Sequence, residues 1–392
     1  MASLSNPFPN GVIRPLGSKD GPISGANTSL GAGIGDTFFI DYRNPVVQQW
    51  NFNIQREVAN DWVLMVGYLG SKGQHLPDGE SSMQYNQLPT SSWSLGTNLL
   101  ANVPNPFLGK IQDPTSVYYQ PTIQARLLLT PYPQYNGVGA FRKPQANSIY
   151  HSMVASVEHK YRNGLVMLMS FTGGKLLDDA SQVVSFIGQA GTKQDFFCRK
   201  CEKSVSAQDV PMRLVTSLTY ELPVGKGRKF LAGMPKLADA LIGGWQVNGI
   251  NVFQKGIPLA IGNNGNSANL GAPGIRPTAT GVDPYKGGDI GDRLNNYFNQ
   301  ASFSQTPNYA FGTLGRFLPN VRQVGTHNLD FSLFKNYHPN EKVNLQFRAE
   351  AYNSTNTNSW GNPGNTLGTS TFGIVTTKSG NRTMQLGLKL IF

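Results

Sequence analysis

The last nine residues of the chain constrain its fold most strongly. Five apolar side chains alternate with polar or small ones: Met384, Leu386, Leu388, Leu390 and Phe392. Successive side chains of a β-strand point to opposite faces, so this strand has one apolar face and one polar face. A strand of this kind that ends on an aromatic residue is typical of transmembrane β-barrels in outer membranes. The last strand of a soluble β-domain remains the alternative interpretation.

Eight earlier segments alternate in the same way. They cover residues 49–55, 62–68, 149–161, 165–171, 212–222, 245–253, 328–333 and 343–351. In several of them the second face carries charges, as Glu221, Asp330, Arg348 and Glu350 show. Isolated charges are costly to bury in a packed core, whereas the inner face of a wide barrel is polar and wet. These segments therefore favour a barrel whose apolar side faces outward.

The connections between these segments alternate in length. Short links fall at 58–60, 162–164 and 338–340, with one longer link at 223–243, and long links cover 71–147, 176–210, 258–326 and 354–380. Short periplasmic turns and long extracellular loops distinguish the two rims of outer-membrane barrels. Compact soluble domains seldom contain several such long connections. We therefore predict an all-β fold, an antiparallel up-and-down transmembrane barrel of nine or ten strands, whose last strand ends at the periplasm and whose residues 1–45 belong to an external loop.

The number of strands bears on domain organisation. Nine up-and-down strands leave two edges that run in the same direction, whereas single-chain bacterial barrels have an even number of strands. The first residues also lack the basic start and apolar stretch of a signal peptide, which an exported protein needs. We therefore expect residues 1–392 to be the C-terminal part of a larger barrel, with any plug and N-terminal domains absent from this sequence.

The charge composition gives no support to nucleic-acid binding. The chain carries a net charge of +11, but charged residues make up only 14% of it and are scattered. Its one compact basic cluster, Lys226, Arg228 and Lys229, is interpreted as a solvated turn. An excess of positive charge also suits an anionic membrane surface. Outer-membrane lipid is therefore an expected partner, and nucleic acid is not.

Motifs that could carry chemistry are few. Cys198 and Cys201 form a CxxC pattern without nearby histidines for zinc and without the strand–helix context of a redox motif. In an external loop we predict a disulfide, and two free thiols are the alternative. The glycine-rich stretches 31–35 and 225–228 match neither a dinucleotide nor a phosphate-loop fingerprint. We find no catalytic constellation and expect no enzymatic activity, no cofactor and no metal.

Several stretches, in order, resemble the C-terminal barrel of Oar-like TonB-dependent transporters, which are abundant in acidobacteria. The matching text includes residues 49–57, 67–73, 86–89, 131–134, 148–151, 163–165, 220–223, 225–227, 243–245, 328–335 and 347–353. Residues 328–335 (NLDFSLFK) and 347–353 (FRAEAYN) are the most specific pieces. The resemblance covers nearly the whole chain.

This resemblance implies a receptor-type barrel in the cell outer membrane of a Gram-negative bacterium. It implies ligand binding or uptake, the barrel-assembly machinery as a partner, and the TonB system as a partner through the N-terminal part. The C-terminal strand would carry the assembly signal. A surface adhesion protein that presents long loops without transport is the second hypothesis, and a soluble β-rich domain is the third.

Overall fold

The computed structural model describes residues 31, 33–37, 42–78, 83–111, 114–140, 143–179, 193–264, 274–340 and 343–392. Nine long strands dominate it: β2 (Val46–Ala59), β3 (Trp62–Asp78), β8 (Lys143–Arg162), β9 (Leu165–Asp178), β11 (Met212–Glu221), β12 (Trp245–Gln254), β18 (Thr326–Asn340), β19 (Val343–Tyr352) and β23 (Thr383–Ile391). Each corresponds to one of the nine segments expected from the alternation. The all-β prediction is confirmed.

The nine strands form one antiparallel sheet in chain order. The order is β2-β3-β8-β9-β11-β12-β18-β19-β23, and the two-residue strand β10 (Ser204–Val205) adds to β9. Every neighbouring pair is antiparallel, so the first and last strands run in the same direction. Among the described residues, β2 and β23 each have one partner strand within this sheet and form its two edges.

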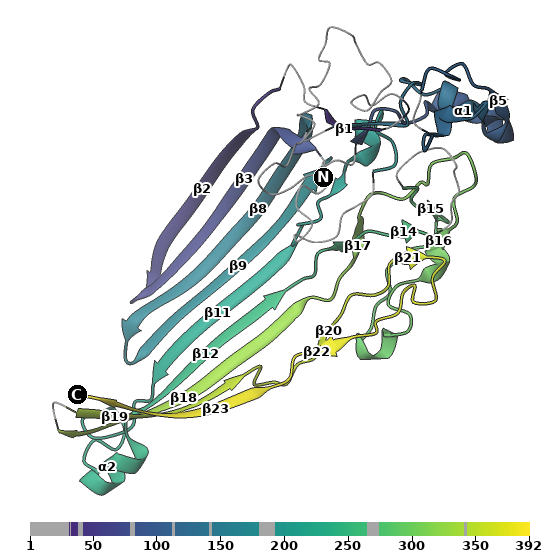
Figure 1. Cartoon of the computed structure of the whole chain (residues 1–392). Helices are drawn as coiled ribbons and strands as arrows, with labels where there is room; N and C mark the ends of the chain where they lie inside the picture. The colour runs from purple at the N-terminus through teal and green to yellow at the C-terminus, as the bar shows by residue number, and fades with distance from the viewer. Residues whose placement is uncertain are drawn as a thin grey trace, which may run out of the picture.

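The two ends of the sheet differ, as the alternation of link lengths predicts. At one end, which we call the short-turn rim, β2 leads into β3 and β8 into β9 through two-residue turns. Asn163 and Gly164 form the second of these turns, and both have the positive φ that such a tight turn requires. The C-terminus and helix α2 (Lys236–Ile242) lie at this rim, and the long loops lie at the opposite one, the long-loop rim (Figure 1).

The long connections are not featureless, and some are shorter than the sequence pattern suggested. The first long loop begins only after Asp78 and ends before Lys143, because β3 and β8 continue beyond the membrane-length segments. The loops contain short elements: β1 (Gly33–Thr37), β4 (Met83–Gln84), η1 (Thr90–Leu100), β5 (Asn102–Pro104), η2 (Val117–Tyr119), β6 (Thr122–Gln124), α1 (Ala125–Leu128), β7 (Gly137–Ala140), η3 (Arg199–Glu202), β13 (Pro258–Leu259), β14 (Gly262–Asn263), β15 (Thr278–Ala279), η4 (Gly291–Arg293), η5 (Gln300–Ser302), β16 (Phe303–Ser304), β17 (Leu318–Arg322), β20 (Ser359–Trp360), β21 (Thr366–Leu367) and β22 (Lys378–Ser379).

The hydrophobic cores lie in these loops and not on the long strands. The largest cluster joins residues of the 258–321 and 372–375 segments around Phe298, which is fully buried. Its rings meet edge to face, with the centroid of Phe298 5.1 Å from that of Phe372 and 5.5 Å from that of Phe303. A second cluster surrounds Tyr118, also fully buried. The external loops are therefore folded modules with their own packing.

Two of the buried tyrosines in these modules have raised pKa values. Burial raises the pKa of Tyr118 to about 12, and the Arg126 charge partly opposes this rise. Burial likewise raises the pKa of Tyr297, against the smaller effect of Arg293. Both phenols also donate hydrogen bonds to backbone carbonyls, from Tyr118 to Tyr135 (3.3 Å) and from Tyr297 to Arg322 (2.8 Å). Neutral, hydrogen-bonded tyrosines thus help to fix the loop cores.

No helix among the described residues is both long and apolar enough to cross a membrane. The longest α-helix in the part of the chain that the structure describes is α2, which has seven residues and falls on the weak helical pattern visible in the sequence at 234–241.

Candidate functional site

The register of the sheet places the alternating apolar residues of the nine segments on one side, although a few others, such as Leu168, Ile250 and Phe334, lie on the opposite side. One row across five strands consists of Tyr220, Val247, Leu333, Ala349 and Leu386. At the other end of the sheet, Phe52 pairs with Tyr68, which in turn pairs with Met153. Many of these side chains are strongly exposed, Phe52 at 66% and Leu386 at 73%. A continuous apolar surface of this extent is what a barrel presents to lipid.

Aromatic residues mark two levels of this apolar side. Near the short-turn rim, Trp62 packs edge to face against His159, with ring centroids 4.6 Å apart. Farther along the same strands, Trp50 donates to the Tyr68 hydroxyl at 3.4 Å, and this hydroxyl lies 2.6 Å from Nδ1 of His151. Amphipathic rings at both boundaries of the apolar band are typical of outer-membrane barrels.

The opposite side of the sheet is polar over its last strands. Glu221, Asp330, Arg348 and Glu350, which the sequence assigns to the inner face, all lie on this side. Their partners are mainly neutral: Arg348 donates to Gln346 at 2.6 Å, and Glu350 accepts from Gln385 at 2.9 Å. Hydrogen bonds between single charges and amides suit a wet surface better than a dry core. In a barrel this side would line the lumen.

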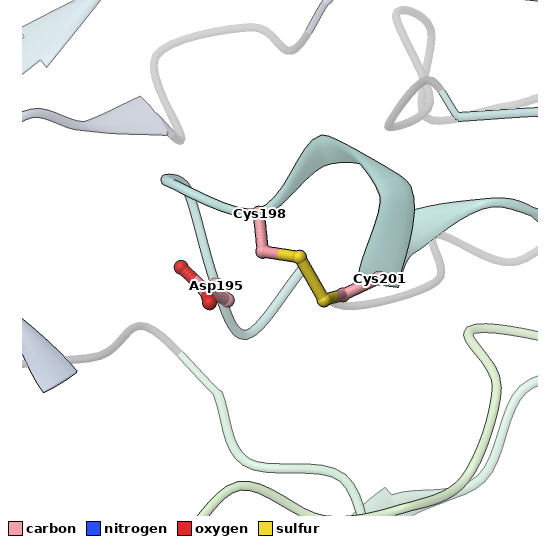
Figure 2. A group of neighbouring side chains, drawn as sticks. All are labelled: Asp195, Cys198 and Cys201. Atoms are coloured by element: carbon pink, nitrogen blue, oxygen red, sulfur yellow. A yellow bond between two sulfur atoms is a disulfide. The ribbon is translucent and has the colours of Figure 1, made fainter.

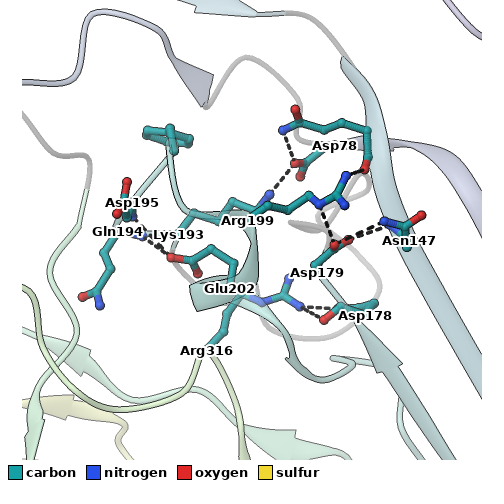
Figure 3. Close-up of polar contacts among 12 residues, drawn as sticks. Asp78, Asn147, Asp178, Asp179, Lys193, Gln194, Asp195, Arg199, Glu202 and Arg316 are labelled. Carbon is teal, nitrogen blue, oxygen red and sulfur yellow. Dashed lines mark hydrogen bonds and ion pairs between the residues drawn. The ribbon is translucent and has the colours of Figure 1, made fainter. Parts of the chain in front are cut away.

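An array of ion pairs anchors the segment 193–209 at the long-loop rim (Figure 3). Lys193 pairs with Asp78 at the end of β3, and next to it Arg316, which comes from the 274–322 loop and not from this segment, pairs with Asp178 at the end of β9. Arg199 reaches Asp179 at 3.2 Å, and the same carboxylate accepts the backbone amide of Asn147 at 2.6 Å. The loop is therefore tied to the outer ends of two strands.

The most enclosed of these pairs is Arg276 with Glu202. Their charged atoms are 2.5 Å apart, and the side chains are 3% and 1% exposed. Glu202 also accepts from the backbone amides of Gln194 and Asp195, at 3.2 and 3.3 Å. Removing one partner of a buried pair is strongly destabilising, because the other charge is left uncompensated. The pair therefore fixes the 193–209 segment to the 274–322 loop.

Cys198 and Cys201 lie within this anchored segment and are joined by a disulfide bond (Figure 2). Their Cα atoms are 5.3 Å apart. Asp195 completes a group whose ligand-type atoms lie within 4.8 Å of one another, the only such group among the residues that the structure describes. Because bonded sulfur atoms cannot act as thiolate ligands, this group presents a single carboxylate to a cation.

Two of the cavities among the described residues lie at opposite rims. One, of 510 Å³, is enclosed by residues 221–246 and the ends of β18 and β19, with a lining that includes Asp239, Lys335 and Asn344. The other, of 470 Å³, lies at the external end of β12 and is lined by aromatic and basic residues such as Tyr285 and Arg293. Their linings could bind small polar or amphiphilic molecules.

The loop modules and their ion pairs have no counterpart in the sequence pattern. The charges involved are far apart in the chain: Glu202 and Arg276 are separated by 74 residues, and Asp178 and Arg316 by 138. No local pattern predicts such pairs. The aromatic residues between 285 and 317 were a usable signal, since a run of Tyr and Phe in a polar loop indicates a local core.

The sheet, its two contrasting sides and its two unlike rims define a membrane β-barrel domain. The family model "Outer membrane beta barrel domain" matches residues 1–385, and the chain belongs to this family. The predicted location, the outer membrane, is therefore confirmed. A search of curated proteins found no match.

The chain is also similar, at low identity, to parts of larger solved structures. The outer membrane transporter YddB from Escherichia coli matches with a TM-score of 0.43 and 9% identity, covering 93% of this chain and 34% of its own. The pyoverdine outer membrane receptor FpvA from Pseudomonas aeruginosa matches with a TM-score of 0.37 and 10% identity. This match covers 89% of this chain and 30% of FpvA. The FrpB iron transporter from Neisseria meningitidis matches with a TM-score of 0.34 and 9% identity. This match covers 92% of this chain and 32% of FrpB. The chain thus spans about a third of the length of these structures.

Proposed function

We propose that the chain forms part of the wall of a TonB-dependent transporter or receptor that binds a ligand or takes it up across the outer membrane. The observation that carries the proposal is the sheet itself, which has an apolar side for lipid, a polar side for a lumen and folded loops on one rim. The ordered Oar-like motifs add support, because they extend over nearly the whole sequence.

The two unpaired edges support a larger barrel. In a bilayer, open sheet edges leave backbone groups without hydrogen-bond partners, which lipid cannot supply. Direct pairing of β2 with β23 would be parallel and would give an odd number of strands, unlike single-chain bacterial barrels. We therefore propose that residues 1–392 supply the C-terminal strands, while a plug and the segment that contacts TonB belong to an N-terminal part.

Cross-linking in living cells tests this function without knowledge of the ligand. The natural protein, carrying an affinity tag in an external loop, is treated with formaldehyde and purified from its own host. We expect a cross-linked product that contains TonB and is lost when the TonB gene is deleted. Efficient membrane insertion of the natural protein without any such product would contradict energy-coupled transport.

Surface adhesion is the second candidate, and the folded external modules favour it. Buried clusters such as that around Phe298 give the loops a defined shape that a binding partner could recognise. Proteolytic shaving of intact cells separates the two candidates. If the protein is an adhesin, shaving abolishes attachment and no TonB product forms; if it is a transporter, the TonB product persists after shaving.

A further inference from the structure

The connection between β11 and β12 has an unusual surface for a link at the short-turn rim. It runs over residues 222–244, whereas β2–β3 and β8–β9 are joined by two residues each. Five of its large apolar side chains are exposed: Phe230 (52%), Leu231 (58%), Leu237 (84%), Leu241 (74%) and Ile242 (49%). Exposed apolar residues gathered in so short a segment indicate a surface that is covered by something else.

The internal contacts of this link show which side of α2 is left open. Asp239 accepts the backbone amide of Lys226 at 2.7 Å and lines the cavity at this rim. Leu237 and Leu241 are four residues apart and therefore share a helix face, and each lies about 200° around the helix from Asp239. The polar side of α2 thus packs back on the rim, while its leucine side points away from it.

The link is also continuous with the lipid-facing side of the sheet. Trp245, which follows it directly, lies on that side in register with Lys335, which is in turn in register with Phe347. The indole of Trp245 donates to the carbonyl of Leu241 at 3.0 Å. Lys335 donates to the carbonyl of Gly243. These contacts hold the end of α2 against the boundary of the apolar band.

The charge of the link complements an anionic surface. It contains Lys226, Arg228, Lys229 and Lys236 against the single carboxylate Asp239, so its net charge is four minus one, or +3. The three lysines are exposed, whereas Arg228 is paired with Glu221 at 3.1 Å. Apolar side chains next to exposed lysines are the combination that binds segments to the headgroup region of membranes.

We propose that residues 222–244 form an interfacial anchor on the periplasmic surface of the outer membrane. The five apolar side chains enter the boundary between headgroups and acyl chains, and the lysines contact the phosphates of anionic phospholipids. The anchor would fix the depth of this side of the barrel, whether or not the protein transports a ligand.

Fluorescence quenching in vesicles tests the anchor. The full chain with Leu241→Cys is labelled with a small fluorophore and inserted into vesicles of phosphatidylethanolamine and phosphatidylglycerol that contain brominated acyl chains. The matched control is Leu108→Cys, which is 52% exposed in a loop at the long-loop rim. Folding of both variants is checked by heat-modifiable migration. We expect several-fold stronger quenching by brominated lipid at 241 than at 108, and the reverse order with aqueous iodide.

A charge variant tests the lipid chemistry. Lys226→Gln, Lys229→Gln and Lys236→Gln together should weaken the quenching at 241 in vesicles with phosphatidylglycerol and leave it unchanged in pure phosphatidylcholine. Two outcomes overturn the proposal. Iodide access at 241 in both lipid mixtures would mean that the link stays in water, and protection from iodide without quenching by brominated lipid would mean that protein covers it.

Discussion

At the scale of single residues, substitution of a buried charge tests whether the ion pairs stabilise the external loops. Replacing Glu202 by Gln leaves Arg276 buried without its counter-ion, which we expect to cost about 3–5 kcal/mol of local stability. Hydrogen exchange over residues 193–209 measures this loss as easier local opening.

The matched control is the exposed pair of Arg228 with Glu221, whose side chains are 48% and 31% exposed. Glu221→Gln should change stability by no more than about 1 kcal/mol, because water screens such pairs. Equal effects of the two substitutions would show that the Glu202 pair is not enclosed in the folded protein.

The disulfide is a second prediction at this scale. In protein isolated without reductant, Cys198 and Cys201 should resist alkylation, and prior reduction should add two labels to the intact mass. The oxidising conditions outside the inner membrane favour this bond. Two labels without reduction would instead support the alternative of free thiols.

The raised pKa of Tyr118 predicts a response to high pH. Because its pKa is raised to about 12 from an ordinary value of 10.0, the stability it contributes is complete below about pH 10 and is lost as the pH rises through 12. Protease susceptibility of residues 114–140 should therefore increase over this range. The Tyr118→Phe variant should show a smaller increase, and the difference in tyrosinate absorbance between the two proteins should titrate near pH 12.

At the scale of elements, the two faces of β23 predict unequal tolerance of charge. Leu386→Lys places a charge on the lipid side and should cost about 2–4 kcal/mol near the middle of the bilayer. Gln385→Lys, one residue away on the polar side and next to Glu350, should fold normally. The fraction of heat-modifiable protein after refolding into vesicles measures both, and equal yields would contradict the assigned faces.

The end of the same strand carries the predicted assembly signal. Phe392 is 93% exposed, so its side chain contributes little to packing within the chain. Deleting it should reduce insertion in cells through the assembly machinery while leaving refolding into vesicles nearly unchanged. If insertion in cells is also unchanged, the strand Met384–Phe392 does not act as that signal.

At the scale of the whole molecule, the larger-barrel proposal predicts that β2 and β23 do not meet. In a chain with Cys198 and Cys201 replaced by Ser, Ile54→Cys and Leu386→Cys should give no cross-link within one molecule. Ala349→Cys with Leu386→Cys, which are direct partners in β19 and β23, should cross-link readily. A high yield between Ile54 and Leu386 positions would mean that the nine strands close on themselves.

The alternation of apolar and polar residues was sufficient to predict the strands of the sheet, because this alternation is a local property of each strand. Tyr220, Leu333 and Leu386 each belong to an alternating segment, and the antiparallel register then brings them into one row. Helix α2 was only weakly visible, since its seven residues are too few for a clear period. The exact ends of β3 and β8 were missed, because beyond the membrane both strands continue into a mixed apolar and polar pattern.

The sequence by itself therefore determined the membrane-facing part of this protein: nine strands, their lipid side and the unequal rims. Lipid on one side and water on the other require apolar and polar side chains to alternate with a period of two, which is visible directly in the sequence. Only the tertiary structure decided how the loops fold, because the partners that bury Phe298 and pair Glu202 with Arg276 come from distant parts of the chain. Their contacts depend on three-dimensional packing, which leaves no periodic trace in the sequence.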